Sequence, residues 1–128
     1  MKKDIRYLNI GCGSTIFPSP WENLDGREMP GVDHVSGIDK LSFPDNTFDI
    51  VYSSHTIEHV KRDEIEQVLK EWIRVLKPGG MLRVATPDFE AAIEVYQKSG
   101  KRIENILGLI VGGQSYEYEC HYLIYDKR

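Results

Sequence analysis

A strand, an amphipathic helix and a second strand follow one another in the middle of the chain, and this order constrains the fold most. The helix is expected within residues 62–80, because an apolar stripe recurs there every three or four positions, formed by Ile65, Val68, Leu69, Trp72, Ile73 and Leu76. Pro78, Gly79 and Gly80 are predicted to end it. Residues 48–54 and 81–87, on either side, are short apolar runs typical of buried strands. We therefore expect an α/β fold with a Rossmann-like, mostly parallel sheet.

The N-terminal part predicts further strands. Residues 5–10 form a short apolar run that stops at a glycine, and residues 21–26 and 32–37 are expected to be the second and third strands. Residues 26–31 are fewer than the dozen or so that a parallel crossover usually needs. Either the helices after the first two strands are reduced to turns, or one of these strands is wrong. Two further helices are predicted within residues 87–100 and 101–111.

The bulk composition is that of an ordinary folded domain. The chain has 128 residues, of which 41% are hydrophobic and 28% charged, so we expect one domain spanning residues 1–128. A net charge of −4 without a basic block indicates no nucleic-acid partner. Neither a membrane-spanning run nor a signal-peptide core is visible, which favours a cytoplasmic protein without a membrane partner. Cys12 and Cys120 are expected to stay thiols.

A His-x-x-Glu-His sequence in "SSHTIEHVK", residues 53–61, has the spacing of one class of zinc peptidase. On a helix, His55 and His59 would share one face, and Glu58 could act as general base to a zinc-bound water. A zinc hydrolase is therefore a remote alternative. Such a site also needs a third protein ligand, and no downstream Glu or His falls in a convincing helical frame. We expect no metal.

The segment "LNIGCGST" closes the first strand with Gly11 and Gly13 around Cys12. Two glycines in such a turn allow positive φ and a close approach of the backbone to a nucleotide-like ligand, although a plain tight turn has the same pattern. A dinucleotide fingerprint fails, because its third glycine falls on Ile16. Asp25, at the end of the second strand, could accept hydrogen bonds from both hydroxyls of a ribose, or belong to an ordinary turn before Gly26.

Two longer segments identify a family. "LSFPDNTFDIVYSSHTIEHV" continues into "RVLKPGGMLRVATPD", and from about residue 5 to residue 89 the chain resembles the class I S-adenosylmethionine-dependent methyltransferases, of the methyltransferase type 11 kind. The resemblance implies S-adenosylmethionine as cofactor and S-adenosylhomocysteine as product. It implies methyl transfer to an unidentified acceptor, for which we favour a small molecule. A non-catalytic S-adenosylmethionine-binding or interaction module is the alternative.

The resemblance also assigns roles to individual positions. The loop Gly11–Gly13 would lie under the methionine part of the cofactor, and Asp25 would hold the ribose. Gly37 and Ile38 would flank the adenine, while Ser53, at the tip of the fourth strand, would contact the methionine end.

Two positions depart from the family pattern. Asn9 replaces the acidic residue that usually precedes the glycine loop, so it brings no charge to the ammonium group of the cofactor. Gly37 replaces an aspartate, so an amide, a water or the nearby Asp39 must meet the adenine amino group.

Methyl transfer is an in-line displacement that needs few catalytic side chains. If the acceptor is a hydroxyl or an amine, a base would help, and the candidates are His55, Asp88 and His121. In the family frame His55 lies at the mouth of the site, and Glu58 and His59 start the following helix.

The C-terminal segment raises a question about assembly. Family members have a helix and two more strands after the part that resembles residues 112–128, so we expect five of seven strands and an apparently truncated domain. Residues 115–125 are rich in aromatics, with Tyr116, Tyr118, Tyr122 and Tyr125. They could pair with the exposed edge of the fifth strand, cross to another subunit, or begin the missing region. We expect a homodimer through this tail.

Overall fold

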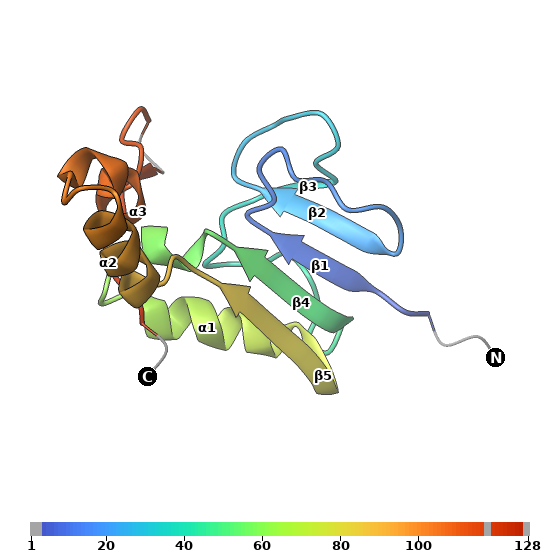
Figure 1. Ribbon diagram of the computed structural model, residues 1–128. Helices are drawn as coiled ribbons and strands as arrows, with labels where there is room; N and C mark the ends of the chain where they lie inside the picture. The colour runs from blue at the N-terminus through green and yellow to red at the C-terminus, as the bar shows by residue number, and fades with distance from the viewer. Residues whose placement is uncertain (1–3, 117–118, 127–128) are drawn as a thin grey trace. The chain divides into compact units, whose positions relative to one another are not determined.

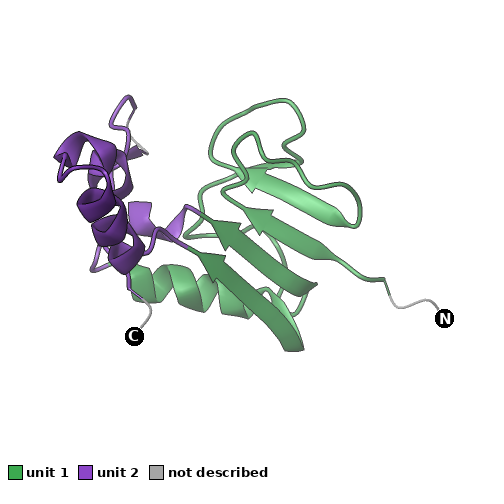
Figure 2. Cartoon of the chain, viewed as in Figure 1, with its two compact units in different colours: residues 1–54, 64–85 green, residues 55–63, 86–128 purple. Residues whose placement is uncertain are grey.

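The computed structural model describes residues 4–116 and 119–126 (Figure 1). The chain contains two compact units, which Figure 2 distinguishes by colour. Unit 1 comprises residues 1–54 and 64–85, and unit 2 comprises residues 55–63 and 86–128. That the whole chain is one domain stays a prediction, and each unit is described by itself.

In its described residues, 4–54 and 64–85, unit 1 is a parallel sheet with one helix. Five strands lie in the order β3-β2-β1-β4-β5, and every neighbouring pair is parallel. Their bounds are Tyr7–Ile10 for β1, Trp21–Asp25 for β2, His34–Val35 for β3, Phe48–Ser54 for β4 and Leu76–Ala85 for β5. Helix α1, Ile65–Arg74, connects β4 to β5 and runs along one face of the sheet (Figure 1). The predicted Rossmann-like α/β fold is confirmed.

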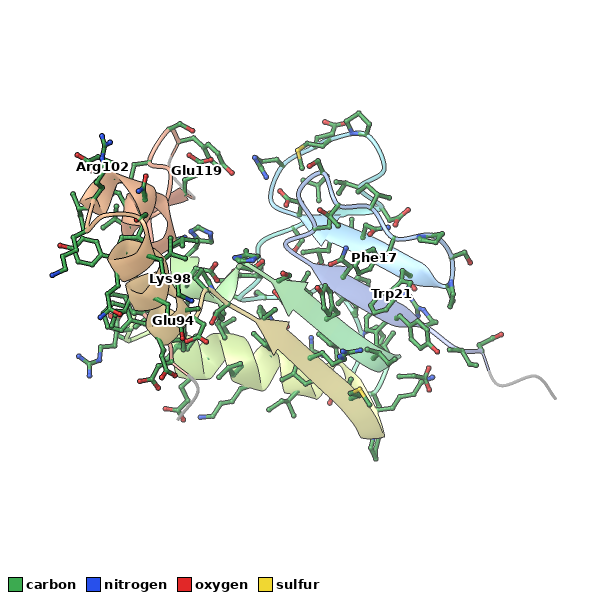
Figure 3. All side chains as sticks on the ribbon, in the orientation of Figure 1. Phe17, Trp21, Glu94, Lys98, Arg102 and Glu119 are labelled. Carbon is green, nitrogen blue, oxygen red and sulfur yellow. The ribbon has the colours of Figure 1, made fainter. Side chains whose placement is uncertain are left out.

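The links after β1 and β2 contain no helix, as their shortness predicted. Residues 11–20 instead fold back as a loop that places Phe17 beside Trp21, at 5.1 Å between ring centroids (Figure 3). Trp21 also contacts Tyr7 at 5.0 Å, and Phe17 contacts Tyr52 at 5.4 Å. Because register pairs Tyr7 with Trp21, their side chains leave the same face of the sheet. A loop with aromatic contacts thus takes the place of a helix on this face.

The core of unit 1 includes the side chains that leave the central strands on the face opposite to these aromatic residues. Leu8, Ile10, Leu24 and Val51 alternate with the aromatic positions and are fully buried. Val68 and Trp72 are the buried apolar residues of α1. The Trp72 Nε1–H donates to the carbonyl of Ile38 at 2.9 Å, which ties α1 to the segment after β3.

Helix α1 ends at Arg74, earlier than the predicted stop at Pro78. The carbonyl of Val75 accepts hydrogen bonds from the backbone N–H groups of Thr47 and Phe48, so the chain has already joined the sheet there. Pro78 and its two glycines lie inside β5, where the register jumps from Phe48–Leu76 to Ile50–Met81. An edge strand tolerates proline and an irregularity, because one side of its backbone needs no strand partner.

Unit 2 contains α2, Phe89–Lys98, and α3, Leu107–Val111, with two 3-10 turns, η1 at Ile57–His59 and η2 at Ile103–Asn105. The prediction that Glu58 and His59 start the helix after β4 is wrong, because they form η1 and α1 begins only at Ile65. The helix predicted over residues 101–111 is divided into η2 and α3, because Ile106, with φ −123°, interrupts it.

The tail returns to its own unit. The N–H groups of Tyr122 and Leu123 both donate to the carbonyl of Glu58, at 2.8 and 3.3 Å, and Tyr125 forms an isolated parallel bridge with Asp88. Among the described residues, β5 has only β4 as a strand neighbour, so pairing of the tail along β5 is not observed. Tyr118 lies outside the described residues.

Within residues 4–116 and 119–126, no helix combines the length and the apolar character needed to cross a bilayer.

Candidate functional site

The glycine loop directly follows β1 in unit 1. Gly11 and Gly13 have positive φ angles of 67° and 52°, a conformation that residues with a Cβ rarely adopt. Between them, the Cys12 N–H donates to the carbonyl of Leu24 at 3.0 Å, which continues the β1–β2 pairing into the loop. The loop therefore lies at the carboxyl ends of two parallel strands, where open α/β sheets bind ligands.

Asp25 is the last residue of β2 and is buried beside this loop. Its Oδ2 accepts the Gly13 N–H at 2.8 Å, and its Oδ1 accepts the backbone N–H and the Nε–H of Arg27, at 3.0 and 3.1 Å. Burial works to raise the pKa of Asp25, but the hydrogen bonds from Arg27 and Gly13 outweigh it and hold this pKa below its ordinary value. Asp25 is thus a negatively charged acceptor at neutral pH.

Asn9 belongs to a buried amide network beneath the loop. Its Nδ2 donates to the carbonyl of Thr15 at 3.0 Å and to the Oδ1 of Asn23 at 3.1 Å. Asn23 in turn accepts the Phe17 N–H at 2.9 Å, and its Nδ2 donates to the carbonyl of Phe17 at 3.0 Å. The amide of Asn9 therefore fixes the shape of the loop, and a direct contact with a cofactor stays a prediction.

Cys12 is a structural thiol. Burial, with a smaller contribution from the charge of Asp25, raises the pKa of Cys12 to about 11. Since the thiolate is the reactive form, a thiol with this pKa is a poor nucleophile at neutral pH. Cys12 therefore suits a packing role beneath a ligand better than a role in the chemistry.

The remaining predicted cofactor positions lie at two other strand ends of unit 1. Gly37 and Ile38 follow β3, and a Cβ added to Gly37 would lie 2.8 Å from the Oδ1 of Asp39, so that carboxylate packs against the glycine. Ser53, near the end of β4, is fully buried, and its hydroxyl donates to the carbonyl of Ile10 at 3.1 Å. Its hydroxyl is thus used by the backbone, and its role as a cofactor contact stays a prediction.

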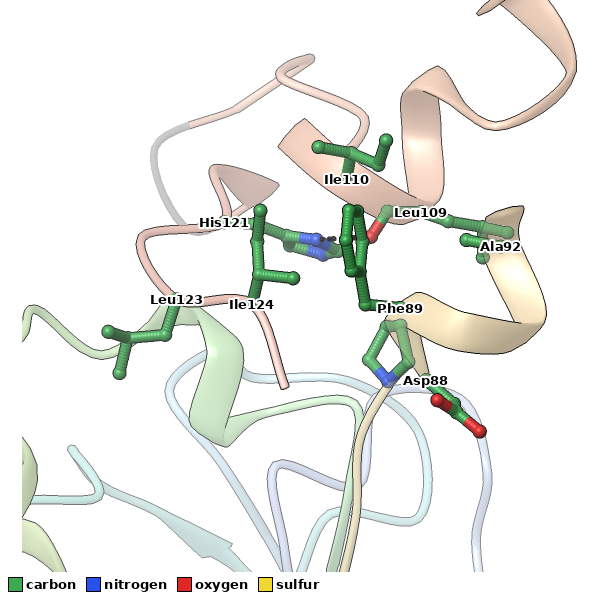
Figure 4. A pocket seen from close by; sticks show the side chains of 9 residues that line it. Asp88, Phe89, Ala92, Leu109, Ile110, His121, Leu123 and Ile124 are labelled. Atoms are coloured by element: carbon green, nitrogen blue, oxygen red, sulfur yellow. Dashed lines mark hydrogen bonds between the residues drawn. The ribbon is translucent and has the colours of Figure 1, made fainter. Parts of the chain in front are cut away.

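The three candidate bases all belong to unit 2. His55 has a left-handed backbone, with φ 52°, and an exposed side chain. Asp88 caps α2 by accepting the Glu90 N–H at 3.1 Å. The His121 Nδ1 lies 3.1 Å from the carbonyl of Leu109 (Figure 4). Asp88 and His121 also line a mainly apolar pocket formed by the start of α2, by α3 and by the tail.

The His-x-x-Glu-His segment does not form the helix that a zinc peptidase uses for its two histidines. Its last two residues lie in the 3-10 turn η1, and His55 precedes that turn. Glu58 is almost completely buried, at 1% exposure, and the hydroxyl of Tyr125 is also buried. Burial, and secondly the charge of Glu58, raise the pKa of Tyr125.

Sequence reasoning missed two residues of the site. Arg27 approaches Asp25 from only two positions away, and Asn23 supports the loop through contacts that depend on how residues 11–20 fold back. An arginine two residues after the candidate ribose-binding Asp25 is a visible signal for the first. No pattern in the sequence indicated the second.

Comparisons with known proteins find methyltransferases. The profile of the family described as "Methyltransferase domain" matches residues 28–84. The probable methyltransferase ltbC of Aspergillus luteorubrus is 46% identical over an alignment that covers 64% of this chain and 40% of that protein. The sterol 24-C-methyltransferase of Aspergillus fumigatus is 47% identical, with 66% and 28% covered.

A solved structure agrees as well. An S-adenosylmethionine-dependent methyltransferase of Thermotoga maritima, described as a possible histamine N-methyltransferase, has a TM-score of 0.59 and 28% identity, covering 81% of this chain and 60% of that one. Together these similarities support a class I S-adenosylmethionine-dependent methyltransferase domain. It spans less than half the length of the two Aspergillus methyltransferases.

Proposed function

We propose that this methyltransferase chain binds S-adenosylmethionine at the carboxyl ends of β1 and β2 and serves methyl transfer to a small-molecule acceptor. The observation that carries the proposal is the buried, ionised Asp25 held against the glycine loop by the Gly13 N–H. A carboxylate in this place suits the two hydroxyls of a ribose, and the positive-φ glycines allow the backbone to approach the rest of the cofactor.

Each part of the chain would make a distinct contribution. The loop Gly11–Gly13 would support the methionine part, Asp25 the ribose, and Gly37 with Ile38 the adenine. Ser53 would contribute near the methionine end through its backbone, since its hydroxyl already donates to Ile10. Asn9 would act through the shape of the loop.

The cofactor supplies the reactive carbon, whose bond to sulfur breaks as the bond to the acceptor forms. The chain's own task is therefore to bind, to orient the two reactants in line and to exclude water. A hydroxyl or amine acceptor also has to lose a proton, and His55, Asp88 and His121 stay the candidates for the residue that receives it.

A small-molecule acceptor is favoured by what the relatives' names state. One is a sterol 24-C-methyltransferase, another is a ubiquinone/menaquinone biosynthesis C-methyltransferase, and the solved structure is described as a possible histamine N-methyltransferase. These acceptors differ chemically, so they support the class of acceptor and no individual compound. The net charge of −4 gives no support to a nucleic-acid acceptor.

A labelled-methyl assay tests the catalytic part. The intact chain is incubated with methyl-labelled S-adenosylmethionine and pools of sterols, quinones and amines, and binding of S-adenosylhomocysteine is measured in parallel. Binding with transfer to at least one pool supports the proposal. Binding without transfer to any pool would instead favour a non-catalytic S-adenosylmethionine-binding module.

Assembly and location complete the proposal. We place the protein in the cytoplasm, since Cys12 and Cys120 are both free thiols and secreted proteins tend to pair theirs.

A homodimer through the tail is supported by the exposed Tyr116 and Tyr122, because tyrosine is enriched at interfaces. Light scattering on the intact chain and on a chain cut after Gly113 tests the dimer. If both chains are monomeric and equally stable, the proposed dimer is contradicted.

A further inference from the structure

The carboxylate of Glu58 is buried among the described residues without a hydrogen bond. Neither of its oxygens has a hydrogen-bond partner within the described part of the chain, although Glu58 is only 1% exposed. The Nδ1 of His55 lies 3.3 Å from Oε1, but it is not aligned for a hydrogen bond. A buried carboxylate that receives no hydrogen bond is costly, and proteins usually meet that cost with a counter-charge or a metal ion.

Two histidines gather around this carboxylate. Glu58, His59 and His121 each offer one ligand atom, and these atoms all lie within 4.8 Å of one another. The rings of the two histidines are 4.8 Å apart between centroids. Backbone hydrogen bonds hold the arrangement, since the Tyr122 N–H donates to the carbonyl of Glu58 at 2.8 Å and the His121 N–H to that of Val111 at 3.1 Å.

Hydrogen bonds also select one nitrogen in each ring. The Nδ1 of His59 lies 3.0 Å from the carbonyl of Cys120, and the Nδ1 of His121 lies 3.1 Å from that of Leu109. A carbonyl can only accept, so both Nδ1 atoms carry the hydrogen, and in the neutral rings both Nε2 atoms keep a lone pair. A carbonyl behind the ring is the usual outer support of a metal-binding histidine.

We propose that Glu58, His59 and His121 form a binding site for one divalent transition-metal ion. Two imidazoles and one carboxylate suit Zn²⁺ and its first-row neighbours, whereas Mg²⁺ and Ca²⁺ prefer oxygen ligands. Three protein ligands leave at least one coordination position open to a water or to an oxygen of a small molecule. All three residues belong to unit 2, so the site stands independently of the cofactor site proposed for unit 1.

Metal binding requires a small closure of the side chains. Ligands in a tetrahedral zinc site, with bonds of about 2.0–2.2 Å, lie roughly 3.5 Å apart. Side-chain movements of about an ångström from the present arrangement reach that spacing. The rings of His59 and His121 are both half-buried. The ring of His55 lies next to the same carboxylate. Its side chain is exposed, whereas that of Glu58 is buried.

This ligand set differs from the one that the His-x-x-Glu-His spacing suggested. The sequence indicates no third ligand, because no Glu or His follows His59 in a convincing helical frame. The tail instead brings His121 back to η1 through hydrogen bonds to the carbonyls of Glu58 and Val111. In this arrangement Glu58 is a metal ligand and no longer the general base of a peptidase.

The test uses the intact chain without a histidine tag, stripped of metal by a chelator and titrated with zinc chloride in a calorimeter. We expect one zinc ion per chain and a zinc-dependent rise in melting temperature. Replacing the outer partner of a metal ligand usually costs about 10–100-fold in affinity. Losing a ligand itself, in Glu58→Gln, His59→Ala or His121→Ala, should therefore weaken zinc binding at least about tenfold.

Controls separate this site from unspecific binding. His34→Gln removes a histidine of unit 1 that pairs with Glu22, and it should leave zinc affinity unchanged. Glu58→Gln should fold at least as stably as the metal-free wild type, because it removes a buried charge. Absence of stoichiometric zinc, equal zinc affinity in wild type, Glu58→Gln and His121→Ala, or magnesium binding as tight as zinc binding would each overturn the proposal.

Discussion

The carboxylate of Asp25 accepts the backbone N–H of Gly13 at 2.8 Å and so joins the end of β2 to the loop after β1. This hydrogen bond spans the two strand ends at which the cofactor is proposed to bind. It also restrains a loop whose glycines have positive φ. The same carboxylate thus shapes the loop and offers an acceptor to a ligand.

Arg27 is expected to compete with the ribose for Asp25. A carboxylate has about four acceptor positions, and the N–H of Gly13, the N–H of Arg27 and the Nε–H of Arg27 already donate to three of them. Arg27→Gln keeps the backbone donors and frees the side-chain position. We expect calorimetry to show S-adenosylhomocysteine binding tightened by up to about fivefold, equivalent to roughly 1 kcal/mol.

Arg6→Gln is the matched control for that substitution. Arg6 also pairs with a carboxylate of β2, that of Glu22, but at the opposite end of the strand. Its loss should leave the affinity unchanged. Weaker binding in Arg27→Gln would mean that the guanidinium itself holds the cofactor.

Glu71 should make unit 1 sensitive to acid. Its carboxylate accepts hydrogen bonds from Arg74, at 2.7 and 2.8 Å, and from the Leu41 N–H at 2.6 Å. The hydrogen bond from Arg74 lowers the pKa of Glu71 below its ordinary 4.5, although burial opposes it. A lowered folded pKa contributes stability that is present above the unfolded pKa and is lost as pH falls through the folded one.

We therefore expect Glu71→Gln to cost about 1–3 kcal/mol of unfolding free energy at pH 7. The difference from wild type should shrink as the pH falls from about 5 towards 2. Urea unfolding followed by tryptophan fluorescence checks this, because Trp21 and Trp72 both belong to unit 1. Glu66→Gln, which breaks an exposed pair with Lys70 on the same helix, should change little. A pH-independent difference between Glu71→Gln and wild type would contradict the assigned role.

Gly112 should be essential for the return of the tail in unit 2. It has φ 78°, and a Cβ there would overlap the backbone oxygen of Glu119 and approach the ring of His121. Gly112→Ala should therefore displace residues 119–125 and destabilise the unit by roughly 2–4 kcal/mol. Hydrogen exchange at the amides of His121 and Tyr122 measures the loss directly.

Gly100→Ala separates strain from collision. Gly100 has nearly the same φ, 80°, but a Cβ added there meets nothing within 4 Å. This variant should lose only about 1 kcal/mol, from the backbone conformation alone. Equal exchange rates in the two alanine variants would show that the contact with Glu119 does not determine the path of the tail.

Local patterns were sufficient to predict the sheet. Short apolar runs predicted the strands of residues 7–10 and 48–54, and a periodic apolar stripe predicted α1. The end of α1 was misplaced because Pro78 and two glycines usually stop a helix, whereas here they form an irregular part of an edge strand. Tertiary hydrogen bonds override that local signal, because the Val75 carbonyl already accepts the N–H groups of Thr47 and Phe48 at the start of β4.

The candidate sites show the same division. Asp25 and the glycine loop were visible because their roles depend on residues close to strand ends. The grouping of Glu58 and His59 with His121 depends on how the tail folds back, which no spacing in the sequence encodes. Contacts between residues that lie far apart in the sequence are visible only in the structure.

The most direct test of the central claim is a calorimetric titration of S-adenosylhomocysteine into the intact wild-type chain and into Asp25→Ala. We expect wild-type binding in the micromolar to sub-millimolar range, about −4 to −8 kcal/mol. Because charged-group hydrogen bonds to the ribose would be lost, affinity should fall by about 1–3 kcal/mol in Asp25→Ala. Circular dichroism should show that the variant is folded. A folded wild-type chain that gives neither heat nor thermal shift at saturating ligand, or an Asp25→Ala variant that binds as tightly as wild type, would contradict the account.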